Sequence, residues 1–152
     1  MAASAWQLYN EAKKYIGNGT ITLGAGVFKM VLATSASNAS TFTLSAYSEL
    51  TNEISATGGY VTGGKNLVPA TGQWTVGASA KQYKFTYSTV GLTFTASGAS
   101  LTNVKYAVIR NSTGAGAGRL LCWCQLSSSQ FTVTSPNTLT ILPAATGVFT
   151  LT

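Results

Sequence analysis

The chain has 152 residues and a formal net charge of +6, and only 8% of its residues are charged. It contains no His and no Asp, and its three acids are Glu11, Glu49 and Glu53. A catalytic triad needs an imidazole or an equivalent base beside an orienting carboxylate, and paired-carboxylate hydrolysis needs two converging acids. We therefore expect no enzymatic activity, no metal and no cofactor. The length fits one folding unit with a core of its own.

The pattern from Ser4 to Gly17 predicts one helix. Ser4 and Gln7 match a capping box, and Gly17 stands where a left-handed C-cap is expected. Apolar side chains cover a broad arc of this helix, so it must dock on its own domain, on a sister subunit or on a foreign surface. We expect an N-terminal helical arm at 1–17 and a β-sandwich domain at 18–152.

From residue 18 onward, short apolar or alternating runs between Gly, Ser, Asn and Thr clusters predict strands. We expect them at 20–23, 27–33, 65–69, 73–76, 81–88, 91–96, 103–110, 119–126, 130–134, 138–142 and 147–151. This spacing, with little helix, favours an all-β fold, a jelly-roll-like β-sandwich with a short N-terminal α-helix. Because the strands carry Thr and Ser in place of charge, their edges must be covered or used in assembly.

The strands at 103–110 and 119–126 are predicted to form the core hairpin, with Ala115–Gly118 as its loop. The second strand has apolar side chains on both faces, which predicts a central strand under the helix or an outer face against another subunit. Cys122 and Cys124 share one face of that strand. Their spacing disfavours a mutual bridge, so we expect buried free thiols.

Two loop segments stand apart. The polar run Thr34–Thr41 has no apparent anchor and is predicted to be a mobile loop. The glycine-rich string at 58–64 lacks the context of a phosphate loop, so we interpret it as a chain reversal that Tyr60 anchors.

Glu49 and Glu53 are four residues apart in a predicted helical turn and form the closest carboxylate pair of the chain. No third ligand or partner base is predictable near them. We therefore expect a structural role, either capping or ion pairing with Lys65 or Lys81.

The chain shows no run of about 20 apolar residues and no pattern of a secretory signal, so we expect a protein that is made in a cytoplasm and does not enter a membrane. Apart from Lys13 and Lys14, the basic residues are scattered singly. This distribution disfavours nucleic-acid binding and favours weak attraction to an acidic protein surface.

Several strings in this order resemble small structural proteins of tailed bacteriophages, most of all the capsid cement or decoration proteins. They are FKMVL at 28–32, LTNEIS at 50–55, GGYVTGGKNL at 58–67, YAVIR at 106–110, LLCWC at 120–124 and GVFTL at 147–151. The similarity runs over most of the chain. It implies a non-enzymatic β-sandwich that assembles as a homotrimer on the outside of the virion capsid and bridges major capsid proteins.

Under this resemblance, the predicted helix offers the candidate contact residues Trp6, Tyr9, Lys13 and Lys14. The aromatic side chains would serve as anchors and the lysines as a cationic rim. One alternative is a tail, fibre or baseplate module of a virion. A second is a carbohydrate-binding β-sandwich, for which Trp74, Tyr60 and Tyr87 are the candidate stacking residues.

Overall fold

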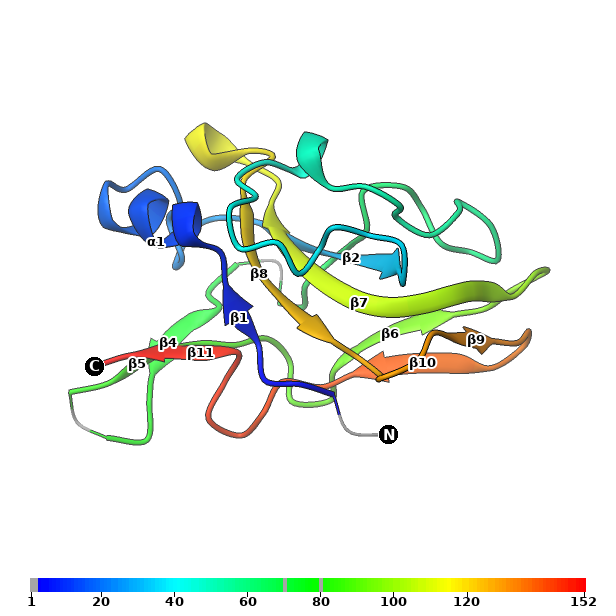
Figure 1. The fold of residues 1–152 in the computed structure, drawn as a ribbon. Coiled ribbons are helices and arrows are strands. Elements are labelled where there is room, and N and C mark those ends of the chain that lie inside the picture. The colour runs from blue at the N-terminus through cyan, green and yellow to red at the C-terminus, as the bar shows by residue number, and fades with distance from the viewer. Residues whose placement is uncertain (1–2, 70, 80) are drawn as a thin grey trace.

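The computed structural model describes residues 3–69, 71–79 and 81–152 (Figure 1). Most of the elements are strands, with one α-helix near the N-terminus. In chain order they are β1 (Gln7–Leu8), α1 (Asn10–Gly17), β2 (Phe28–Thr34), η1 (Tyr47–Glu49), β3 (Lys65–Asn66), β4 (Trp74–Val76), β5 (Tyr83–Phe85), β6 (Leu92–Thr95), β7 (Leu101–Asn111), η2 (Gly114–Gly116), β8 (Leu120–Gln125), β9 (Phe131–Val133), β10 (Thr138–Ile141) and β11 (Phe149–Leu151). The predicted all-β fold is confirmed.

The strands form one large sheet and two small ones. The large sheet has the order β1-β8-β7-β2-β3, and β9 pairs with the beginning of β7. The small sheets are β10-β6 and β11-β5-β4. In Figure 1 the small sheets lie below the large one, so the architecture is sandwich-like. The pairing of β7 with β8 confirms the predicted core hairpin.

The core lies between these layers. Phe28 of the large sheet packs edge-on against Phe85 of β5, with ring centroids 4.9 Å apart, and both rings are fully buried. Tyr87 lies two residues after the end of β5. Its hydroxyl donates a hydrogen bond of 3.0 Å to the carbonyl of Ile141, the last residue of β10. Aromatic packing and a buried hydrogen bond therefore join separate strands of the sandwich.

The N-terminal segment differs from the expected helix. Gln7 and Leu8 pair with Trp123 and Cys122 as an edge strand, and α1 begins only at Asn10. Ser4 caps no helix, because its backbone N–H donates to the Gln125 carbonyl and its hydroxyl accepts from the Gln125 N–H. The predicted start of the helix at Ser4 is therefore wrong. Pairing with the open edge of β8 satisfies more backbone groups than one capping box would.

Two further segments correct the sequence expectations. The strand at 20–23 does not form, because this stretch turns on itself and Thr22 accepts hydrogen bonds from the Ala25 and Gly26 N–H groups. The segment Thr34–Thr41 is anchored, since Ala39 is fully buried and its carbonyl accepts the Tyr9 hydroxyl. Asn38 also accepts the Thr51 N–H. Small polar residues supply these contacts through backbone groups and short side chains.

The strand β8 is covered on both faces, as predicted. Cys122 and Cys124 are buried and free, and burial raises the pKa of the Cys124 thiol to about 12 and that of Cys122 well above its usual range. On the other face, Phe42 lies edge-on to Trp123 at 5.8 Å. Residues of the same chain therefore cover the outer face of this strand.

Candidate interaction surfaces

Glu53 lies at the centre of a hydrogen-bonded cluster that the sequence did not reveal. Its carboxylate accepts hydrogen bonds from the hydroxyls of Tyr47 and Tyr60, the latter at 2.6 Å, and from the Gly63 N–H at 2.7 Å. Burial and then the bond to Glu53 raise the pKa of Tyr47 to about 12, and burial raises that of Tyr60 beyond its usual range. Both phenols therefore stay protonated as donors.

Arg110 of β7 joins this cluster from the large sheet. Its Nε and Nη2 atoms donate to the Gly63 carbonyl at 3.2 and 3.0 Å, and its guanidinium lies 4.3 Å from the centre of the Tyr47 ring. Of the two structural roles expected for Glu49 and Glu53, ion pairing with Lys65 or Lys81 does not occur, because within the described residues the one ion pair joins Glu11 and Lys14. The cluster fastens the glycine-rich loop to the sheet.

The loop at 58–64 is the predicted chain reversal. Tyr60 is buried, and its hydroxyl also accepts the Leu32 N–H at 3.1 Å, so it anchors the loop on β2. Gly63 and Gly64 have φ values of +89° and +81°, which L side chains rarely adopt. The glycines turn the chain, and the tyrosine attaches it.

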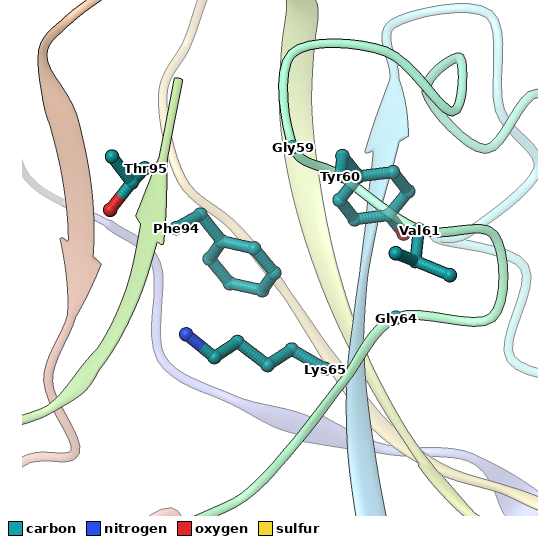
Figure 2. Close-up of a pocket in the computed structure, with 7 residues that line it drawn as sticks. All are labelled: Gly59, Tyr60, Val61, Gly64, Lys65, Phe94 and Thr95. Carbon is teal, nitrogen blue, oxygen red and sulfur yellow. The ribbon is translucent and has the colours of Figure 1, made fainter. Parts of the chain in front are cut away.

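The ring of Tyr60 lines a cavity of about 320 Å³, which we call the tyrosine pocket (Figure 2). Its lining residues are Gly59, Tyr60, Val61, Gly64, Lys65, Phe94 and Thr95. Figure 2 shows the rings of Tyr60 and Phe94 on facing sides, and the Lys65 ammonium donates to the Thr93 carbonyl at 2.8 Å. The Tyr60 hydroxyl donates its hydrogen bond to Glu53, which does not line the pocket. The pocket thus offers ring faces for an apolar group and no acid–base pair.

Glu49 has the capping role that the sequence predicted. Its Oε2 accepts the backbone N–H groups of Ser45 and Ala46 at 2.7 and 3.2 Å, just before η1. These two bonds hold the pKa of the Glu49 carboxyl below its usual range. The cap orders the turn that carries Tyr47 toward Glu53.

Replacing Glu49 with Gln should lower the melting temperature slightly at pH 7, on the order of 1 °C because the side chain is exposed. A carboxyl whose pKa is lowered by folding stabilises the folded state above its unfolded value and loses this contribution as the pH falls through the folded value. The difference between the two proteins should therefore shrink below pH 4.5, the ordinary value of Glu. Thermal melts from pH 7 to pH 3 measure it, and a constant difference would contradict the role of the charge.

The four candidate contact residues do not lie on one surface. Tyr9 is fully buried in the chain's own core and therefore cannot serve as an exposed anchor. Trp6 is half-buried before β1, whereas Lys13 and Lys14 are exposed on α1, and Lys14 pairs with Glu11 at 3.3 Å. Strand β1 separates Trp6 from the helix, and Tyr9 is buried at the N-cap position, directly before α1 begins at Asn10.

Trp6 borders an uncharged surface that we call the N-terminal groove. It consists of two adjoining cavities of about 410 and 360 Å³ that share Ala3, Ile141 and Leu142. None of the lining residues carries a charge. Leu142 is 57% exposed although it is large and apolar. A surface of this kind is suited to contact with another protein.

The aromatic residues proposed for sugar stacking do not form a platform. Tyr60 and Tyr87 are buried and donate their hydroxyls inside the chain. Trp74 is half-buried and stacks on Tyr83 with ring centroids 5.7 Å apart. The carbohydrate-binding alternative therefore loses two of its three candidate residues.

Among the described residues, no three His, Cys, Asp or Glu side chains cluster as metal ligands, and no helix has the length and hydropathy to span a membrane. No protein-family model matches the chain, and no curated protein or solved structure is recognisably similar to it.

Proposed function

We propose that this chain is a non-enzymatic virion structural protein of a tailed bacteriophage. It binds the outer surface of the capsid as an oligomer and stabilises the lattice of major capsid proteins, without a cofactor, a nucleic acid or a membrane as partner. The proposal rests on the resemblance of the sequence strings given above. The structure supports it chiefly through the chemistry of its exposed side chains.

The observation that carries most weight is that each of the three carboxylate side chains interacts with a group of the same chain. Glu11 pairs with Lys14, Glu49 caps a turn, and Glu53 accepts two tyrosines and a backbone N–H. The net side-chain charge is positive, and the surface also carries exposed apolar residues and neutral hydroxyls. Such a surface can be buried against a partner at little desolvation cost and is steered toward acidic proteins.

The N-terminal groove supports self-association. Each copy carries a net charge of +6, so two copies repel each other unless they meet through an uncharged surface. The lining of this groove meets that condition. We propose a homotrimer, because a trimer fits a local threefold site and because three modest contacts give strong total binding.

Cosedimentation of the purified protein with capsids that lack it tests the proposal. Binding at lattice stoichiometry supports the decoration role, and light scattering should then show a trimer in solution. Binding only at a vertex or to tails would favour the alternative of a tail, fibre or baseplate module. Absence of binding to any virion part would reject both.

Replacing Trp6 with Ala should lower capsid occupancy about tenfold, because the indole anchors the contact between copies at the N-terminal groove and the loss of the trimer removes multivalent binding. Replacing Lys14 with Glu should reduce occupancy less and mainly at low salt, since a rim charge acts on association. Cosedimentation across protein concentrations measures both effects. The control is Val90→Ala, at an exposed loop position outside the groove. Unchanged occupancy in the Trp6 variant would mean that the N-terminal groove makes no contact that capsid binding needs.

A further inference from the structure

The sheet of β4, β5 and β11 continues past the core and leaves part of its apolar face uncovered. Trp74 and Phe149 both pair with Phe85, while Val76 and Leu151 both pair with Tyr83. Directly paired residues point to the same side of a sheet. We call this set the hairpin face: Trp74, Val76, Tyr83, Phe149 and Leu151.

Exposure increases along the hairpin face from the core outward. Phe85 is fully buried and stacks on Phe149 at 5.4 Å. One register step further, Tyr83 is 49% exposed, Leu151 45% and Val76 61%. The opposite side of the same strands carries Thr75, Lys84 and Thr150, as expected for a solvated face. Apolar residues on one face only, kept exposed beyond the core, indicate a surface that another protein covers.

The hairpin face continues into a groove under α1. Ile16 of the helix, the turn at 19–24, Trp74 and Leu151 line a cavity of about 310 Å³. Figure 1 shows β4, β5 and β11 below α1 at the same end of the molecule. The helix and the small sheet thus meet at a shallow groove beside the hairpin face, and this groove shares no lining residue with the N-terminal groove.

The charges beside this surface are positive and unpaired. Lys13 precedes Ile16 by three positions, so the two are neighbours on the helix, and Lys81 precedes Tyr83 in the hairpin loop. Within the described residues, the side-chain ammonium group of neither lysine forms a hydrogen bond or an ion pair. Each carboxylate side chain of the chain is engaged elsewhere, so none is left to neutralise these two ammonium groups.

We infer that the hairpin face and its groove dock an acidic protein surface that presents an apolar side chain to Trp74 and carboxylates to Lys13 and Lys81. The inference rests on the proposed function, which makes the major capsid protein that partner. A second copy of this chain fits poorly, because its net charge of +6 would bring mainly further cations to the contact. A nucleic acid fits poorly as well, since two lysines among aliphatic residues neutralise few phosphates.

Charge substitution at Val76 tests the inference in the cosedimentation assay. Val76→Asp should weaken capsid binding about tenfold or more, because it removes an apolar contact and places a carboxylate against an acidic partner. Val76→Lys removes the same contact but keeps the favourable sign, so it should weaken binding less. Lys81→Glu should weaken binding severalfold at low salt, with little effect at high salt. The matched control is Val61→Asp, at an equally exposed valine beside the tyrosine pocket.

The possible results separate the inference from the proposed function. If the unmodified protein fails to bind capsids, both are overturned. If it binds and Val76→Asp binds equally well, or if Val61→Asp loses as much affinity, only the inference is overturned. A change of oligomeric state in Val76→Asp by light scattering would mean that a second copy covers this face, and competition by DNA would mean a nucleic acid; either result overturns the inference. Circular dichroism confirms that the variants fold.

Discussion

Replacing Gly64 with Ala should lower the free energy of unfolding by about 4 kcal/mol, because two penalties add at this position. Its φ of +81° disfavours any L side chain, and an added Cβ would lie 2.1 Å from the Met30 carbonyl oxygen. That oxygen belongs to β2 in the middle of the large sheet and cannot move without disturbing the pairing of β2. Urea denaturation measures the loss.

Gly72 provides the matched control for this effect. It has nearly the same φ, +79°, but an added Cβ would meet no atom within 4 Å. Gly72→Ala should therefore cost about 1 kcal/mol, which is the backbone penalty alone. The difference between the two variants isolates the steric clash with β2. Equal losses would mean that the glycine-rich loop moves away from β2 without cost.

Replacing Glu53 with Ala should lower the free energy of unfolding by about 3 kcal/mol, because it leaves three donors without their acceptor. The Tyr47 and Tyr60 hydroxyls and the Gly63 N–H all converge on this carboxylate. Tyr60 is buried and cannot find water in its place. Urea denaturation also measures this loss. The slope of the free energy of unfolding against urea concentration shows whether the denatured state has changed.

Two variants show whether the loss belongs to the cluster. Glu53→Gln keeps the size of the side chain and one acceptor oxygen but turns an amide N–H toward donors, so it should cost about 2 kcal/mol. Glu11→Ala removes the exposed pair with Lys14 and should change stability by less than about 0.5 kcal/mol. A loss below 1 kcal/mol in Glu53→Ala would mean that the three donors find other acceptors, and the cluster would then have no part in holding the loop.

Strands with a clear period were predictable one by one. The hairpin of β7 and β8 follows from apolar runs on both sides of a glycine-rich loop, and both strands form within two residues of the expected bounds. Local backbone preference and side-chain alternation suffice there, because neighbouring strands joined by a short loop pair with each other. The free, buried state of Cys122 and Cys124 follows from the same alternation.

The start of the helix was not predictable, because the strand edge that pairs with residues 4–8 instead lies far along the chain. Ser4 and Gln7 satisfy a helix-start pattern, yet Gln125 and Trp123, more than a hundred residues later, offer an open strand edge. Pairing with that edge moved the helix start to Asn10 and buried Tyr9. This strand pairing therefore decides which of the four candidate contact residues remain accessible.

The sequence alone therefore determined the fold class, the core hairpin, the buried thiols and a chemistry without imidazole or aspartate, because these depend on composition and on short-range periodicity. The tertiary structure decided the partners of Glu53 and the uncovered hairpin face. Tyr60 and Gly63 lie only a short way along the chain from Glu53 but reach it only when the loop reverses and Arg110 of β7 holds Gly63. Val76 and Leu151 are far apart in the chain and meet only through β5. Which residues pair across such distances is set by the packing of the whole domain, and no local pattern encodes it.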